Sequence, residues 1–218
     1  MMSRRNVGLG LLAAAGLGAT PALADEPKVI ELPPPWKSGG KPLAEALWAR
    51  RSTRVFATDR PVPIPVLSNL LWSAYGINRP ASGDRTVPSW RHAIEAAVYV
   101  AAADGVWLYD PRRHRLTQVI PDDVRVQTGV QDFVATAPLT LVYVADGDRL
   151  EGAAGDEKRF WAFTDCGFIG QNVYLFCASE GLAAVFRASF DRVRLAKTLG
   201  LPPTKIITCA QTVGYPKA

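Results

Sequence analysis

Beyond residue 42, the apolar positions repeat with two different periods, and each period predicts its own kind of element. Spacings of three and four residues predict amphipathic helices at residues 43–50, 65–76, 158–180 and 191–199. Short runs of apolar and β-branched residues predict strands at residues 98–100, 139–145, 183–186 and 205–213. Two more runs, at residues 106–109 and 116–120, flank Asp110 and Pro111 and predict a hairpin.

The order of these elements predicts the fold class. Helices and strands are interspersed, but the hairpin joins two strands directly and breaks a strict alternation. We therefore expect an α+β fold in which a central mixed or antiparallel β-sheet is flanked by helices. The longest predicted helix, residues 158–180, carries a broad apolar stripe. Charged residues such as Lys158, Asp165 and Glu180 lie within it, so a membrane span is not expected.

Two stretches lack either period. Residues 31–41 are rich in Pro and Gly, which predicts an extended arm or tether, with folding beginning near Pro42. Residues 78–89 carry Pro, Gly, Ser and Asp and predict a loop. Counted from a predicted cleavage site after residue 24, the chain divides into an arm at residues 25–41 and one folded domain at residues 42–218.

The first residues have the pattern of a secretory signal. A short basic start precedes an apolar run at residues 7–20, and Ala22-Leu23-Ala24 fits a cleavage site. Within this tract, residues 3–7 resemble the twin-arginine export signal. We expect residues 1–24 to be a signal peptide and the protein to be periplasmic or otherwise exported, with the export machinery as a partner. Ordinary secretion and an uncleaved anchor remain open as well.

Composition and charge exclude several classes of protein. The 218 residues are 48% hydrophobic and 21% charged, which is typical of a globular protein with one domain. The formal charge of +5 includes two arginines of the signal segment. The other basic residues are spread among acidic ones and form no stripe with aromatic residues, so no nucleic-acid partner is expected.

Cysteine and histidine are too few for the common metal and nucleophile sites. Cys166, Cys177 and Cys209 lie in apolar surroundings and are expected to be buried small side chains. With only His92 and His114, we expect neither a zinc site nor a Ser-His-Asp triad. His114 lies among arginines in the predicted hairpin turn, where a solvated turn residue is the expectation.

The segment at residues 50–54, Arg-Arg-Ser-Thr-Arg, carries the strongest candidate chemistry. A dianionic phosphate needs several donors that converge from different directions, and forked guanidinium groups with a hydroxyl supply them. A basic cluster at the end of a helix also complements the helix dipole without any ligand. These residues alone leave both interpretations open.

Four motifs occur together in the right order. They are the basic segment Arg50, Arg51, Ser52 and Arg54 after a first helix, Pro88-Ser89 before a strand, a long apolar helix ending in Gly181-Leu182, and a last strand ending in Val213-Gly214-Tyr215-Pro216. In this combination the chain resembles the nitroreductase family over residues 43–217, most closely its dehydrogenase branch, which includes the peptide azoline oxidases. The resemblance implies a nitroreductase-like, intertwined homodimer with FMN between the subunits.

The resemblance also implies roles for individual residues. Arg50, Arg51, Ser52 and Arg54, together with Lys217, would hold the FMN phosphate. Pro88 and Ser89 would lie along the flavin ring, with His92 and Ile94 at positions where the family commonly has Asn and Gln. Ala188 and Ser189 would bring a backbone N–H near flavin N5, and Arg187 would add positive charge there. For His92 and Arg187 an ordinary structural role is equally open.

The chemistry implied by the resemblance is that of the flavin, so no side chain is expected to be a catalytic acid or base. We expect an FMN-dependent oxidoreductase with a ping-pong cycle, in which a small-molecule donor such as NAD(P)H delivers hydride at N5 and a nitro, quinone or similar acceptor takes the electrons. NAD(P)H is scarce outside the cytoplasm, so a different donor stays open. The sequence is also compatible with an oxidase of the azoline type, with a flavin-binding protein without turnover and with a structural export-pathway protein.

Overall fold

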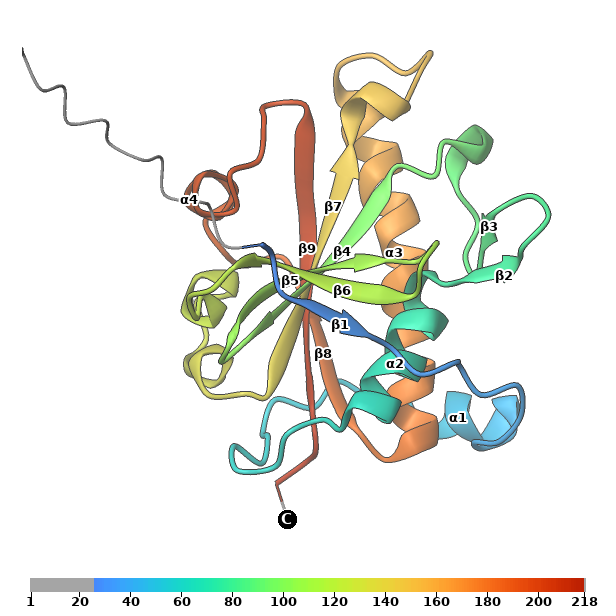
Figure 1. Ribbon diagram of the computed structural model, residues 1–218, viewed down its shortest axis with the longest axis vertical. Coiled ribbons are helices and arrows are strands. Elements are labelled where there is room, and N and C mark those ends of the chain that lie inside the picture. The colour runs from blue at the N-terminus through green and yellow to red at the C-terminus, as the bar shows by residue number, and fades with distance from the viewer. Residues whose placement is uncertain (1–25, 218) are drawn as a thin grey trace, which may run out of the picture.

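A seven-stranded sheet forms the centre of the protein (Figure 1). The computed structural model describes residues 26–217, and the predicted signal peptide lies outside them. Neighbouring strands are antiparallel throughout this sheet, in the order β1-β6-β5-β4-β7-β9-β8. The strands are β1 (Val29–Glu31), β4 (Ala96–Ala102), β5 (Gly105–Asp110), β6 (Arg115–Ile120), β7 (Leu139–Asp146), β8 (Ala183–Arg187) and β9 (Lys205–Gly214). The predicted α+β class with an antiparallel sheet is confirmed.

Helices cover both faces of the sheet (Figure 1). The long helix α3 (Asp156–Glu180) and α2 (Ile64–Tyr75) pack on one face, and α1 (Leu43–Ala49) lies against α3. The short helix α4 (Arg192–Thr198) packs on the other face with the 3-10 turns η2 (Arg125–Thr128) and η3 (Asp132–Ala135). Within residues 26–217, no helix is long and apolar enough to cross a membrane.

The helix ends follow from a few residues. Pro65 lies in the first turn of α2, where its fixed φ suits the helix and its missing N–H is not needed. Helix α3 ends at Gly181, which adopts a left-handed φ of 71° that side chains other than glycine rarely tolerate. These boundaries agree with the predicted helices to within about two residues.

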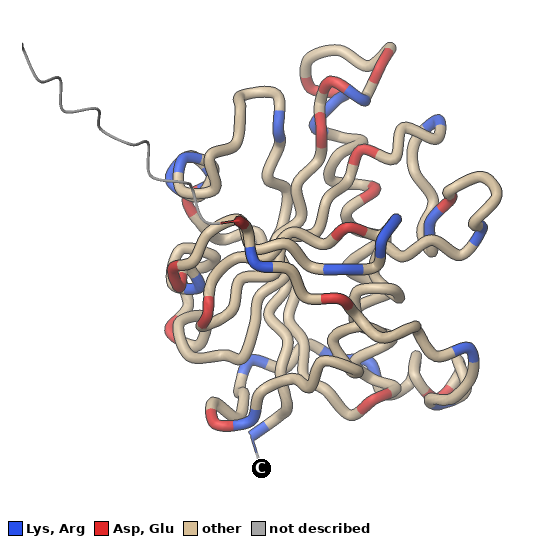
Figure 2. The backbone as a smooth tube through the Cα atoms, viewed as in Figure 1, with Lys and Arg blue, Asp and Glu red and all other residues tan. Residues whose placement is uncertain are grey.

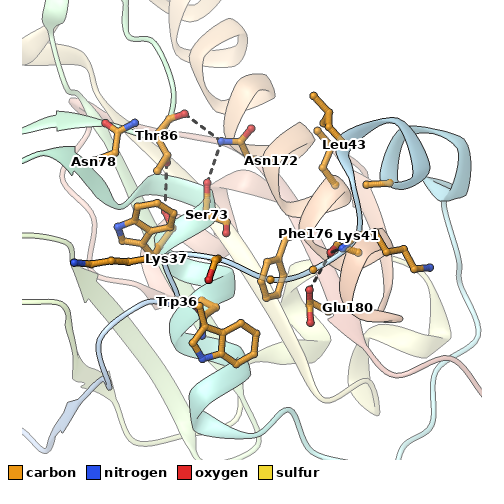
Figure 3. A pocket seen from close by; sticks show the side chains of 18 residues that line it. Trp36, Lys37, Lys41, Leu43, Ser73, Asn78, Thr86, Asn172, Phe176 and Glu180 are labelled. Carbon is orange, nitrogen blue, oxygen red and sulfur yellow. Dashed lines mark hydrogen bonds between the residues drawn. The ribbon is translucent and has the colours of Figure 1, made fainter.

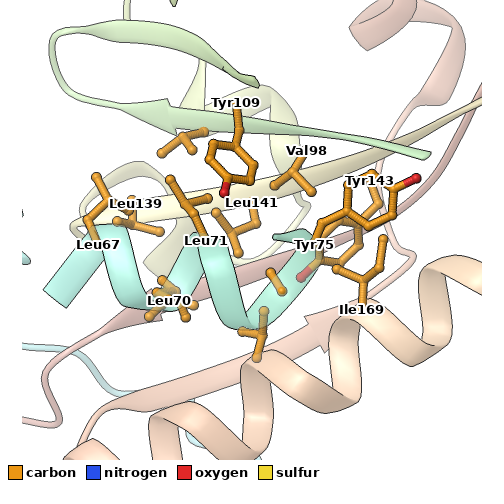
Figure 4. Close-up of a cluster of buried hydrophobic side chains, with 14 of the residues drawn as sticks. Leu67, Leu70, Leu71, Tyr75, Val98, Tyr109, Leu139, Leu141, Tyr143 and Ile169 are labelled. Carbon is orange, nitrogen blue, oxygen red and sulfur yellow. The ribbon is translucent and has the colours of Figure 1, made fainter. Parts of the chain in front are cut away.

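The main core lies between the sheet and helices α2 and α3 (Figure 4). Successive side chains of β7 point to opposite faces of the sheet. Leu141 and Tyr143 therefore belong to this core, while Val142 packs toward α4. All three cysteines are buried and unpaired, as predicted, and burial raises the pKa of each thiol above its ordinary value. On the outer side of α3, by contrast, Phe160 is 60% exposed.

The arm is more structured than the sequence predicts. Folding was expected to begin near Pro42, yet the chain joins the sheet at Val29, because β1 pairs with β6 and covers what would otherwise be an open edge. The arm then runs along α2, where the Trp36 N–H donates to Asn69 Oδ1 at 2.7 Å and Ser68 Oγ donates to the Pro33 carbonyl. A three-residue strand is too short to show a period, which is why the pattern missed it.

The expectation of a solvated His114 is wrong. Its ring is half-buried between the arm and the hairpin, with Nε2 2.7 Å from Ser68 Oγ and Nδ1 2.9 Å from the Tyr109 hydroxyl. Burial lowers the pKa of His114 below its ordinary value. The predicted loop at residues 78–89 also differs in detail, because it contains the short strands β2 (Ile77–Arg79) and β3 (Asp84–Arg85).

Candidate functional site

The basic segment at residues 50–54 leaves α1 and runs beside the edge strand β8. The Thr53 N–H donates to the Ala184 carbonyl at 2.9 Å, which fixes the segment to that strand. The end of the chain lies on its other side, where the Lys217 N–H donates to the Val55 carbonyl at 3.3 Å. Backbone hydrogen bonds therefore bring the two ends of the predicted phosphate-binding set together from opposite ends of the sequence.

A cavity of about 620 Å³ opens at this junction. Its lining includes four cationic side chains, Lys41, Arg51, Arg54 and Lys217, and the hydroxyl-bearing residues Ser52, Thr53 and Tyr174. No carboxylate is among its lining residues, and none of these four cations makes an ion pair with a carboxylate of residues 26–217. Elsewhere both signs of charge are interspersed over the molecule, as Figure 2 shows. The cavity is therefore a local concentration of uncompensated positive charge.

Arg50 differs from its neighbours in the same segment. Its guanidinium carbon lies 5.2 Å from the centroid of the Tyr174 ring, a cation–π contact with α3, and Arg50 is not among the residues that line the cavity. The structure thus brings Arg51, Ser52, Arg54 and Lys217 into one cavity and places Arg50 behind them.

Strand β8 is the edge strand of the sheet next to this cavity. The groups on that edge belong to alternate residues, since the Ala184 carbonyl accepts from Thr53 and the Phe186 N–H donates to the Tyr174 hydroxyl at 2.7 Å. Ala188 and Ser189 directly follow the strand, and both are exposed. Strand β8 therefore leads from the cavity, which Ala184 lines, to the exposed residues 188 and 189.

The loop with Pro88 and Ser89 lies near the opposite end of α3. The Trp90 N–H donates to Asp165 Oδ2 at 2.7 Å, whereas the cavity is lined by Cys177 and Ala178 of the same helix. Twelve helical residues, about 18 Å, separate these two positions. His92 stands on the surface of this loop with 85% of its side chain exposed. Within one chain the loop is therefore set apart from the phosphate-binding set.

Arg187 lies on the face of the sheet opposite α3. It is buried, and its guanidinium donates to the Thr128 carbonyl and to Thr212 Oγ1. Burial lowers its pKa to about 10, so it remains a cation at neutral pH. In one chain its side chain does not line the cavity beside Arg51.

Comparison with known proteins decides the family. Residues 47–215 match the profile of the Nitroreductase family, which is most of the chain. The chain belongs to the nitroreductase family. A protein of Methanocaldococcus jannaschii that carries a nitroreductase name is 31% identical over 158 residues, which cover 68% of this chain and 79% of that protein. The residues whose motifs suggested the resemblance span the same region.

Solved structures of nitroreductases share this fold. A crystal structure from Ralstonia eutropha JMP134, described as a nitroreductase, has a TM-score of 0.83 and 39% identity, and the match covers 94% of this chain and 97% of that one. The NADPH:FMN oxidoreductase of Vibrio harveyi, solved with NAD+, has a TM-score of 0.61 and 19% identity, covering 81% of this chain and 69% of that one. The second likeness concerns the fold alone. The protein is thus an oxidoreductase of the nitroreductase family.

Beneath the Pro88–Ser89 loop, the protein carries a buried carboxyl pair that the sequence did not reveal. Glu95 and Asp165 are 3% and 4% exposed, and Glu95 Oε2 accepts a hydrogen bond from Ser89 Oγ at 3.0 Å. Burial, with a further contribution from the adjacent Asp165, raises the pKa of Glu95 to about 7. Two signals in the sequence could have predicted the pair. Glu95 is an acidic residue at the start of an apolar strand, and Asp165 lies within the apolar stripe of a helix.

The loop above the pair has an unusual backbone. Arg91, His92 and Ile94 all have positive φ values, of 46°, 57° and 49°. Residues with a side chain rarely adopt this conformation, so other contacts must maintain it. The Ile94 N–H donates to Ser89 Oγ at 2.8 Å, and Ser89 in turn donates to Glu95. The carboxyl pair therefore holds the loop in its shape.

A second cavity, of about 460 Å³, lies between the arm, α2 and α3 (Figure 3). Trp36 and Phe176 supply apolar walls, and Asn172 fixes the floor by donating to the Ser73 and Thr86 carbonyls. Lys41 lines this cavity as well as the basic one. The arm residues that shape it precede the segment that matches the family profile, so this cavity depends on a part of the chain outside the family match.

Proposed function

We propose that this protein is an exported, FMN-dependent oxidoreductase that passes electrons in a ping-pong cycle from a small-molecule donor to a nitro, quinone or similar acceptor. The observation that carries the proposal is the basic cavity beside the edge strand β8, in a chain of the nitroreductase family. The V. harveyi relative is described as an NADPH:FMN oxidoreductase, which supports the same cofactor here.

The residues of the cavity fit the phosphate of FMN. Guanidinium groups offer paired N–H donors, and Ser52 adds a hydroxyl, so the donor set matches a tetrahedral dianion. The absence of carboxylates among the lining residues means that nothing there repels an anion. We propose that Arg51, Ser52, Arg54 and Lys217 bind the phosphate directly and that Arg50 supports them from behind.

The edge of β8 would orient the rest of the cofactor. When bound, FMN supplies the redox chemistry by taking up two electrons and passing them on. The exposed backbone at Ala188 and Ser189 offers an N–H donor at the far end of the edge, where it would hold the ring and favour negative charge on it. The protein's part is binding, orientation and electrostatic stabilisation, and no side-chain acid or base is assigned.

We propose that the working unit is a homodimer. Apolar side chains stand exposed on α1 and on the outer side of α3, and they include Leu43, Leu47, Trp48, Phe160 and Phe168. Large apolar side chains exposed together on neighbouring helices mark a protein interface. A second copy would also bring its own Pro88–Ser89 loop, with His92, toward the flavin ring bound by the first.

We expect the isolated protein to be yellow and to contain FMN. Native mass spectrometry of protein recovered from the exported fraction tests three parts of the proposal. We expect a chain that begins at Asp25, two chains per particle and one FMN per chain. A colourless protein that takes up no added FMN would overturn the flavin assignment. A chain retaining residues 1–24 would overturn cleavage of the signal, and a monomer with full FMN would overturn the dimer.

Turnover is tested by the colour of the bound flavin. We expect NAD(P)H, or a substitute donor such as dithionite, to bleach the flavin absorbance, and a nitroaromatic compound or a quinone to restore it under anaerobic conditions. Recovery only when oxygen is admitted would favour an oxidase of the azoline type. A flavin that dithionite reduces but that neither acceptor reoxidises would favour a binding protein without turnover.

A further inference from the structure

Tyr174 connects the phosphate-binding segment to the edge of β8. Its hydroxyl oxygen lies 2.7 Å from Ser52 Oγ and 2.7 Å from the Phe186 backbone nitrogen. Its ring carries the cation–π contact with Arg50. Tyr174 lies on α3, so one side chain links the helix, the basic segment and the edge strand.

The directions of these two hydrogen bonds follow from their chemistry. A backbone N–H only donates, so the Phe186 N–H must donate to the phenolic oxygen. Among residues 26–217 the other hydrogen-bond partner of the Tyr174 hydroxyl is Ser52 Oγ, to which we assign the Tyr174 proton. In the reverse assignment the phenolic oxygen would receive two donors, and the tyrosine proton would turn away from Ser52 toward the cavity that Tyr174 also lines.

This direction determines what Ser52 does. With its oxygen already accepting from Tyr174, the hydroxyl proton of Ser52 is free to donate into the basic cavity. Each bond in the chain also polarises the next, which strengthens the terminal donor. A hydroxyl fixed as a donor favours an anion over a cation or a neutral donor group.

We propose that Tyr174 is a positioning residue whose hydroxyl sets Ser52 as a hydrogen-bond donor to the phosphate of the cofactor, through a relay that starts at the Phe186 N–H. The inference rests on the proposed FMN function and names a residue of the same site. Tyr174 acts through Ser52, so we expect its hydroxyl to strengthen the binding of ligands that carry a phosphate. The affinity for ligands without a phosphate should not depend on it.

The experiment compares FMN with riboflavin, which has the same ring and side chain but no phosphate. Binding of each to the dimer stripped of flavin is followed by quenching of flavin fluorescence in the wild type, Tyr174→Phe, Ser52→Ala and the double variant. Tyr174→Phe keeps the ring and its contact with Arg50 and removes only the hydroxyl. Tyr99→Phe, at another half-buried tyrosine, is the matched control.

We expect Tyr174→Phe to raise the Kd for FMN about tenfold and to change the Kd for riboflavin by less than about twofold. Because the tyrosine acts through Ser52, the double variant should bind FMN no more weakly than Ser52→Ala alone, within about twofold. Tyr99→Phe should match the wild type for both ligands.

Three outcomes would overturn the relay. Equal loss of FMN and riboflavin would assign Tyr174 a purely structural role. Losses that add in the double variant would show that Tyr174 and Ser52 act independently. An unchanged Kd for FMN in Tyr174→Phe would remove the hydroxyl from the site. In each case the wild type still binds FMN, whereas a wild type that binds neither flavin would overturn the proposed function itself and the relay with it.

Discussion

Replacing Arg51 and Arg54 together with Gln is expected to raise the Kd for FMN on the order of a thousandfold. Both side chains are exposed, line the basic cavity and make no ion pair within residues 26–217. Each hydrogen bond from a cation to a phosphate contributes about 1.5 to 3 kcal/mol, so two lost cations account for an effect of this size. The melting temperature of the flavin-free protein should stay near that of the wild type, because exposed unpaired arginines contribute little to folding.

Riboflavin again separates the phosphate from the ring. We expect the double variant to bind riboflavin almost as the wild type does, since the ring is assigned to the β8 edge rather than to the arginines. Arg112→Gln with Arg113→Gln, in the exposed hairpin turn, removes the same net charge far from the cavity and serves as the control. If this control lost as much FMN affinity, the effect would be one of overall charge. If the cavity variant kept its FMN affinity, the phosphate site would lie elsewhere.

Much of the fold was predictable because its elements are long and periodic. Helix α3 shows its burial pattern over many turns, and β7 is an apolar run that only a central strand can accommodate. Short elements were not predictable, and β1 is the clearest case. Its three residues carry no period, and its place in the sheet comes from pairing with β6, which is a tertiary contact. His114 was misjudged for the same reason, since the arm that buries it folds over from elsewhere in the sequence.

The candidate site was predictable only as far as motifs extend. The sequence pointed to Arg51, Ser52, Arg54 and Lys217 through the family resemblance, and the fold places these four around one cavity. Tyr174 was not predictable, because a tyrosine within an apolar helix has the same pattern as a core residue. The role proposed for Tyr174 depends on its hydrogen bonds with Ser52 and Phe186, and Ser52 lies more than a hundred residues away in the sequence. Contacts of this kind have no trace in local periodicity.

The buried pair of Glu95 and Asp165 should make the stability of the protein depend on pH. In the unfolded chain Glu95 has an ordinary pKa near 4.5, and in the fold burial raises it to about 7. Between these values the folded protein retains a proton that the unfolded chain has lost, so the free energy of unfolding decreases as the pH rises. The expected loss is about 2 to 3 kcal/mol across this window, with no further change from Glu95 above it.

Among residues 26–217, the groups packed around Glu95 offer its carboxylate no hydrogen-bonded cation. Tyr75 of α2 and Arg85 of β3 face the same cluster, with the Arg85 guanidinium carbon 5.0 Å from the centroid of the Tyr75 ring. Within residues 26–217, Arg85 Nε and Nη1, the Tyr75 hydroxyl and Glu95 Oε1 find no hydrogen-bond partner. A charged Glu95 would therefore be buried without a bonded cation, and burial, with a smaller contribution from Asp165, is the physical reason for its retained proton.

Glu95→Gln tests this explanation, because the amide is neutral at every pH and, like the protonated acid, offers both a donor and an acceptor. Urea unfolding of the flavin-free protein, followed by tryptophan fluorescence at pH 5, 6, 7 and 8, gives the free energy of unfolding for each form. We expect the wild type to lose about 2 to 3 kcal/mol relative to Glu95→Gln between the lowest and highest pH, so that the variant is the more stable of the two at pH 8. Glu151→Gln, an exposed carboxylate, should follow the wild type. Parallel curves for the wild type and Glu95→Gln would show that folding does not raise the pKa of Glu95, and the explanation would be overturned.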